Sequence, residues 1–176
     1  MSDSIQAVNA FLDNLFVHGP WLVYLVILVA CFIENIFPPF PGDSFIVAAG
    51  ALVGLGRLQL IPALLTVICG GMASVMVLYW FGRRYGRDFF WRRDFKYFSR
   101  RDIEAVEKRL ARWGGGILVI SRFVVGIRAA LAVAAGIGRY SSVRMFIYST
   151  ISYLLFAGLL MYIAVSLVEN LEVIER

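Results

Sequence analysis

The sequence predicts an all-α integral membrane protein: an inverted repeat of two re-entrant helical hairpins and two full transmembrane helices, preceded by an interfacial helix. Three observations predict this class. Hydrophobic residues make up 60% of the 176 residues, with a mean hydropathy of +0.77, whereas a soluble domain is usually about 45–50% apolar. Two apolar stretches are long enough to span a bilayer. Two others are interrupted midway by charged residues and helix breakers.

The composition also excludes several classes of function. A soluble protein with a nucleic-acid partner is excluded by the hydropathy, despite a sequence pI of about 9.5. We expect the net charge of +5 to orient the chain in a membrane instead. No residues have the spacing of a metal site or of a nucleophile with its base, so neither an enzyme nor a cofactor is predicted. Cys31 and Cys69 lie in apolar runs and are predicted to be buried small hydrophobes without a disulfide.

The N-terminal residues predict a helix at the membrane interface. Within residues 1–19, apolar side chains recur at spacings of three and four and oppose polar ones, as in helices that lie along a membrane surface. His18, the one histidine, sits in the turn that ends this segment. A solvated turn residue is the favoured interpretation, because loops normally face water. A proton relay is the alternative.

Residues 20–56 predict the first re-entrant hairpin. Their first apolar run stops at Glu34, after fewer residues than the roughly 20 that cross a bilayer. Pro38 and Pro41 then break the helix, because proline has no N–H to donate and constrains the residue before it. Gly42 completes the break, and a second apolar helix with several small residues follows.

Residues 60–82 predict the first full transmembrane helix. The segment 83–112 that follows holds eleven of the seventeen Lys and Arg residues. The positive-inside rule therefore places it in the cytoplasm. Two interpretations of this basic segment are equally favoured. It binds anionic headgroups, or it serves only as an orientation signal.

Residues 113–138 predict the second re-entrant hairpin. Arg122 and Arg128 interrupt its apolar residues, as the acids interrupt those of the first hairpin. The break rests on Gly126, and Gly136 is a further candidate hinge residue in this hairpin.

Residues 143–168 predict the second full span. Each half of the chain then consists of one hairpin and one span. A hairpin returns to the side from which it entered, whereas a span changes sides, so the second hairpin enters from the opposite face. Its tip should meet the tip of the first hairpin near the middle of the membrane. Transporters built from inverted repeats with broken helices place their binding sites at such a point.

Four charged residues at these tips predict a functional cluster, because a charge at the bilayer centre costs about 3 kcal/mol on insertion scales. Arg122 and Arg128 can bind a phosphate bidentately. Glu34 and Asp43 can hold the arginines while the site is empty, and can take up a proton when an anion arrives. Two structural alternatives stay open. The ion pairs could only lock the hairpins together, and Asp43 could mainly be a helix N-cap.

The order and spacing of these residues resemble the DedA family, the bacterial branch of the VTT-domain superfamily, over nearly the whole chain. The resemblance lies in three motifs. These are Glu34 with Pro38 and Pro41-Gly42-Asp43, then Gly70-Gly71 with Tyr79, Gly82-Arg83 and Gly86, and lastly Ser121-Arg122-Phe123 with Gly126, Arg128 and Gly136. The chain departs from the family in its second hairpin, where Val125 and Ala132 replace prolines that many members have.

The resemblance implies a multi-pass transporter of the plasma (bacterial inner) membrane, a flippase or scramblase coupled to H⁺ or Na⁺. Its implied partner is a membrane phospholipid or a polyprenyl phosphate, such as phosphatidylethanolamine or undecaprenyl phosphate, and a homo-oligomer stays open. By position, Glu34 and Asp43 would be the family's acidic pair, and Arg122 and Arg128 its essential arginines. Two other functions stay open: a proton-coupled transporter of a small solute or drug, and a non-transporting scaffold for envelope assembly.

Overall fold

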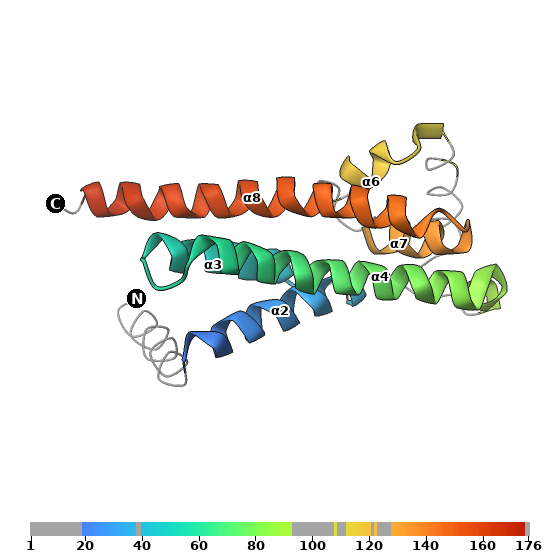
Figure 1. Ribbon diagram of the computed structural model, residues 1–176, viewed down its shortest axis with the longest axis horizontal. Coiled ribbons are helices and arrows are strands. Elements are labelled where there is room, and N and C mark those ends of the chain that lie inside the picture. The colour runs from blue at the N-terminus through green and yellow to red at the C-terminus, as the bar shows by residue number, and fades with distance from the viewer. Residues whose placement is uncertain are drawn as a thin grey trace.

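The computed structural model describes residues 19–37, 40–92, 108, 112–120, 122 and 128–174, and the regular elements of this part are helices (Figure 1). They are α2 (Pro20–Ile36), α3 (Gly42–Gly54), α4 (Leu60–Arg92), α6 (Gly116–Ile120), α7 (Arg128–Ile137) and α8 (Ser142–Ile174). Several predictions fall outside the described residues: the interfacial helix over 1–19 except its last residue, most of the basic segment, Pro38 and Gly126.

Two helices are long and apolar enough to cross a membrane, over Leu60–Gly86 in α4 and Ser142–Asn170 in α8. They run side by side in opposite directions (Figure 1). Only 28% of the most apolar window of α8 is buried, although the core helix of a soluble protein would be mostly buried. Its outward face instead carries exposed large apolar side chains, among them Phe146, Leu154, Leu159, Tyr162 and Leu167. An apolar surface of this extent is suited to lipid.

Both long helices extend beyond the predicted spans 60–82 and 143–168. The prediction ended the first span at its arginines, but a charge ends only the apolar stretch, and arginine is a good helix former. Helix α4 changes direction at Gly86, whose φ of 66° lies in the left-handed region. Glycine adopts this conformation without the steric cost of a Cβ atom.

Helices α2 and α3 form an antiparallel pair whose connection lies partway along α4 (Figure 1). Helix α2 ends at Ile36 with Phe37 as its C-cap, where the prolines predict the break. Helix α3 begins at Gly42, and its N-cap residue is Pro41, with no side-chain cap hydrogen bond. The interpretation of Asp43 as an N-cap is therefore wrong. Its carboxylate turns instead toward an arginine of α7.

Helix α7 is the most enclosed element described, because every residue from Ala129 to Gly136 is buried. Its small side chains bring the backbone of α4 close. A Cβ atom at Gly136 would overlap the carbonyl oxygen of Tyr79, and one at Gly82 would overlap that of Val133. Gly136 lies inside α7, and the close approach of two backbones explains the glycine. Its role as a hinge stays a prediction.

The short helices contact the long ones in a regular pattern. Helices α2 and α7 pack on α4, whereas α3 and α6 pack on α8. Helices α2 and α7 also contact each other, and there the Glu34 side chain meets that of Arg128. The pair of α2 and α3 is thus held by both long helices, and α7 and α6 likewise each contact one of them.

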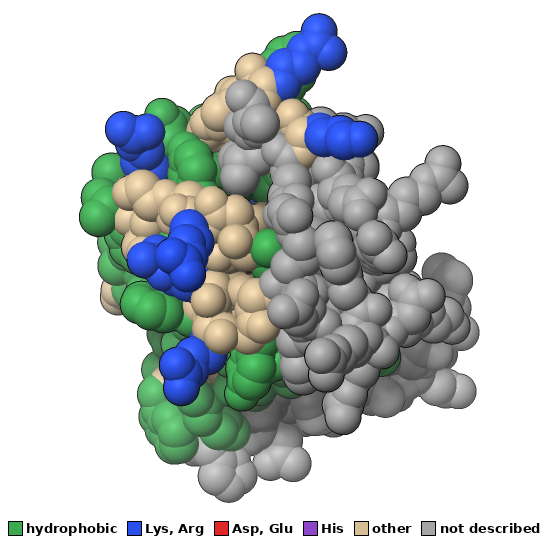
Figure 2. Space-filling view, turned by 90° about the vertical axis from the view of Figure 1, so that its right-hand side faces the viewer, with side chains coloured by type: hydrophobic (Ala, Val, Ile, Leu, Met, Phe, Trp, Pro, Cys, Tyr) green, Lys and Arg blue, Asp and Glu red, His purple; other side chains and the backbone are tan. Residues whose placement is uncertain are grey.

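One end of the molecule is basic. Figure 2 shows this face, and Lys and Arg side chains dominate the charged residues in its coloured part. The exposed basic residues of the described chain between the C-terminal part of α4 and the start of α8 are Arg83, Arg84, Lys108, Arg112, Arg139 and Arg144. Four of these residues, Arg83, Arg84, Lys108 and Arg112, belong to the basic segment predicted over 83–112.

Candidate functional site

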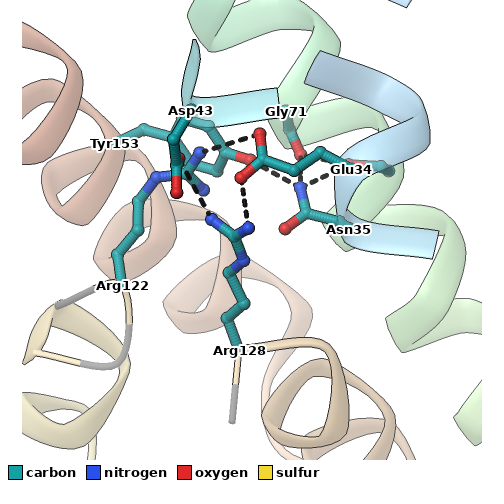
Figure 3. Close-up of polar contacts among 8 residues, drawn as sticks. Glu34, Asn35, Asp43, Gly71, Arg122, Arg128 and Tyr153 are labelled. Carbon is teal, nitrogen blue, oxygen red and sulfur yellow. Dashed lines mark hydrogen bonds and ion pairs between the residues drawn. The ribbon is translucent and has the colours of Figure 1, made fainter. Parts of the chain in front are cut away.

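Four charged side chains meet in one cluster, two from α2 and α3 and two from the region of α6 and α7 (Figure 3). Glu34 comes from the last turn of α2, and Asp43 from the first turn of α3. Arg128, the first residue of α7, forms a close ion pair with Glu34 Oε1, and its Nη1 lies 3.4 Å from Asp43 Oδ1. Arg122 Nη2 lies 3.9 Å from Glu34 Oε2. The structure therefore brings together the four residues that the sequence predicts to meet.

The four side chains lie at different depths. The Asp43 side chain is 44% exposed and that of Arg128 16%, whereas Arg122 is 3% exposed and Glu34 is fully buried. A carboxylate as deep as that of Glu34 needs a charged partner, because an isolated buried charge is very costly. The gradient also gives the cluster an outer and an inner end. A ligand that enters from the exposed end meets Asp43 and Arg128 before it reaches Arg122.

The guanidinium of Arg122 is held by aromatic side chains of α8. Its Cζ lies 3.3 Å from the ring centroid of Tyr153 and 5.3 Å from that of Phe156, in the arrangement of a cation–π interaction. Its Nε and Nη2 atoms are buried and donate to none of the described residues. This edge of Arg122 is the one that binds a phosphate or carboxylate bidentately.

Sequence reasoning missed Asn35, which is 1% exposed and follows Glu34 in α2. Its Nδ2 donates to the Tyr153 hydroxyl at 2.5 Å, to Ser74 Oγ at 2.7 Å and to the Gly71 carbonyl at 3.3 Å. One amide thus ties α2 to both long helices and holds the tyrosine that stacks on the arginine (Figure 3). The sequence did contain a signal for it, namely an amide at the end of an apolar run. Burial of an amide is costly unless hydrogen-bond partners offset it, so such a residue indicates a buried polar contact.

A small cavity adjoins the cluster, with about 20 Å³ of space, which is room for roughly one water-sized group. Its polar lining consists of Asn35, Arg122, Arg128, Ser149, Ser152 and Tyr153. Arg122 and Asn35 therefore border the same small space.

Gly42 is needed for packing at the cluster. A Cβ atom at this position would overlap the side chain of Glu34. Its φ lies outside the positive region that favours glycine. The glycine permits a close contact, in which α3 passes directly over the buried carboxylate, and its role as a hinge stays a prediction.

The substitution Gly42→Ala is expected to push the Glu34 carboxylate away from Arg128. Overpacking of this kind costs about 1–3 kcal/mol, so the thermal unfolding midpoint in detergent should fall. Ser44→Ala, at an exposed position of the same turn, is the matched control and should leave the midpoint unchanged. Equal midpoints for the two variants would contradict the contact.

Two further predictions concern thiols and metals. Both cysteines are free, and Cys31 is buried, but Cys69 is exposed. The prediction of burial is wrong for Cys69, because an apolar side chain on a membrane helix can face lipid as well as protein. Within the described ranges, no three His, Cys, Asp or Glu side chains are grouped so that they could hold a metal ion.

Comparison with known proteins gives a match to the family model of the VTT domain over residues 40–166. "Undecaprenyl phosphate transporter A" of Bacillus subtilis (strain 168) is 25% identical over 161 residues, which cover 89% of this chain and 79% of that protein. "Protein DedA" of Escherichia coli (strain K12) is 29% identical over 150 residues, covering 82% and 68%.

A third relative, "Alkaline phosphatase-like protein" of Lactococcus lactis subsp. lactis (strain IL1403), is 25% identical over 161 residues, covering 86% and 73%. No solved structure is significantly similar to the chain. One of the three names describes a transporter and one resembles that of an enzyme. The names therefore agree only in part with the expectation of a protein that is not an enzyme.

Proposed function

The chain belongs to the VTT-domain family as a DedA-type membrane protein, and on this premise we propose that it moves a phosphate-bearing lipid between the leaflets of the plasma membrane. The observation that carries the proposal is the buried edge of Arg122, which presents two donors without a protein acceptor among the described residues. This edge lies beside a second arginine and two carboxylates. A phosphate group supplies the acceptors that this edge lacks.

In this proposal α2 with α3, and α6 with α7, form two re-entrant hairpins related by an inverted repeat. The packing pattern supports this assignment, because exchange of the two halves maps the main contacts between short and long helices onto each other. Helix α2 packs on α4 as α6 packs on α8, and α3 packs on α8 as α7 packs on α4. None of α2, α3 and α7 has the roughly 20 residues that a bilayer requires. The basic end shown in Figure 2 then faces the cytoplasm, where it contacts anionic headgroups.

The charges suggest how a phosphate is bound and released. In the empty site, Glu34 and Asp43 neutralise Arg128, and Glu34 also faces Arg122. An arriving phosphate competes with the carboxylates for both arginines. A carboxylate that loses its partner at this depth is destabilised as an anion and takes up a proton. Proton coupling follows from this exchange, and a sodium ion could neutralise the same carboxylate.

The lipid is proposed to be a polyprenyl phosphate, such as undecaprenyl phosphate, or a phospholipid such as phosphatidylethanolamine. The first of these is what the name of the Bacillus relative states for that protein. The lipid chains would stay in the hydrocarbon beside the exposed apolar faces of the helices. This feature distinguishes the proposal from a transporter of a small solute, for which no lipid-facing route to the cluster is needed.

The test is transfer of a fluorescent lipid phosphate across reconstituted phosphatidylcholine vesicles, followed by quenching from outside. We expect the protein to accelerate transfer, and Arg122→Lys to slow it at least tenfold, because an ammonium cannot bind a phosphate bidentately. Arg144→Ala removes an exposed arginine and should keep the full rate. Equal rates for Arg122→Lys and the unaltered protein would overturn the assignment of Arg122.

A further inference from the structure

The amide of Asn35 has a fixed orientation. The Gly71 carbonyl can only accept a hydrogen bond, and Ser74 Oγ donates its own proton to that carbonyl at 2.7 Å. Both groups therefore require the nitrogen of the amide on their side, where Nδ2 donates to them and to the Tyr153 hydroxyl. The oxygen of the amide must point the other way (Figure 3).

Asn35 Oδ1 is a buried acceptor that receives no hydrogen bond from the described residues. Asn35 and Arg122 both line the small cavity described above. The two residues that border this space of about 20 Å³ thus carry unsatisfied donors, Arg122 Nε and Nη2, and an unsatisfied acceptor, Asn35 Oδ1. Buried polar groups are nearly always paired. A single water-sized group satisfies both sides only if it accepts and donates.

We propose that Asn35 Oδ1 is a specificity-determining contact, which accepts a hydrogen bond from the P–OH group of a phosphate monoester. The inference rests on the proposed function, because it assumes that Arg122 and Arg128 bind the phosphate. One phosphate oxygen enters the cavity, accepts from Arg122 and donates its proton to Asn35. The remaining oxygens face Arg128 at the outer end of the cluster.

A phosphodiester cannot make this contact. Its two free oxygens are acceptors only, so the oxygen in the cavity would face Asn35 Oδ1 with no proton between them. A buried acceptor left without a donor is costly, and selection against a ligand often rests on such a penalty. The site is therefore expected to prefer a lipid with a terminal phosphate over one whose phosphate links two groups.

The experiment compares dodecyl phosphate with dodecyl methyl phosphate, which have the same chain and differ in the P–OH group. At pH 5 both carry roughly one negative charge, because the second pKa of a phosphate monoester is about 6. Binding is measured by calorimetry to the full chain in dodecyl maltoside micelles, which contain no phosphate, and the signal of protein-free micelles is subtracted.

We expect the unaltered protein to bind the monoester about tenfold more tightly than the diester, as a lost hydrogen bond to a buried group requires. Asn35→Leu should reduce this ratio to about one, because it removes Oδ1 and keeps the branched shape of the side chain. Ser74→Ala removes one acceptor of Nδ2 and leaves Oδ1 in place, so it is the matched control and should keep the ratio.

Equal affinities of the unaltered protein for the two esters would overturn the inference, and this result does not depend on whether any variant folds. A ratio that survives in Asn35→Leu would also overturn it. If neither ester binds, the proposed function itself fails, since both esters carry the anionic oxygens that Arg122 and Arg128 would bind. A purely structural role of Asn35 would lower both affinities and leave their ratio unchanged.

Discussion

Arg128→Ala is expected to destabilise the folded protein by about 3–5 kcal/mol, the usual cost of removing one partner of a buried ion pair. The cause is Glu34, which is fully buried and pairs closely with Arg128. Arg122 remains, but its nearest contact with the same carboxylate is 3.9 Å. Thermal unfolding in detergent should show a large decrease in midpoint, and reconstituted vesicles should show loss of lipid phosphate transfer.

A double variant separates stability from function. Glu34→Gln combined with Arg128→Met removes both charges, and replacement of a whole buried ion pair by uncharged groups is often nearly neutral. Part of the stability should therefore return, because Arg122 loses Glu34 but keeps its contacts with the rings of Tyr153 and Phe156. Transfer should stay lost because one phosphate ligand is missing. Full transfer by the double variant would show that the ion pairs only lock the two helix pairs together. An unfolding midpoint of Arg128→Ala equal to that of Arg144→Ala would contradict the buried-pair account.

Gly136→Ala is expected to destabilise the protein by about 1–3 kcal/mol, as overpacking of a filled interior does. The added Cβ atom would overlap the Tyr79 carbonyl oxygen and lie 2.8 Å from the backbone nitrogen of Arg83. Both are backbone atoms of α4, so they cannot turn aside as a flexible side chain can. Helix α7 must move away from α4 and carry Arg128 with it, so transfer should fall as well.

Gly158→Ala in α8 is the matched control, because a Cβ atom at that position has no neighbour within 4 Å. Here the same substitution should stabilise α8 by about 0.5–1 kcal/mol, because glycine loses more conformational entropy in a helix than alanine. The two unfolding midpoints should therefore move in opposite directions. A shift of equal sign would contradict the close contact of α7 with α4.

The charged cluster could be predicted from the sequence because charges and prolines are costly inside apolar runs, so each one points to a site. The meeting of the acidic and the basic side chains was predicted by counting membrane crossings, without any knowledge of packing. The pairing of Asn35 with Tyr153 could not be found in this way. Their hydrogen bond joins α2 to α8 across most of the chain, and a single amide or tyrosine has no periodicity that reveals such a partner.

The errors have a common origin in tertiary context. Asp43 has the residue type and the position of an N-cap, but the arginine that it faces is donated by another part of the chain. A glycine such as Gly136 is ambiguous in a sequence, because a hinge and a close backbone approach both require the absence of a side chain. Only the neighbouring helix decides between them.

The packing of α3 on α8 also limits when the N-terminal half of the protein can finish folding during synthesis. Gly50 and Gly54 of α3 fit against Met161, Ala164 and Val168 of α8, so the face of α3 is complementary to a helix that the ribosome makes much later. At about 5–20 residues per second, the intervening chain takes on the order of ten seconds to synthesise. During that interval α3 must be shielded by lipid or by an insertion factor, and the N-terminal half expressed alone should remain a substrate for membrane proteases.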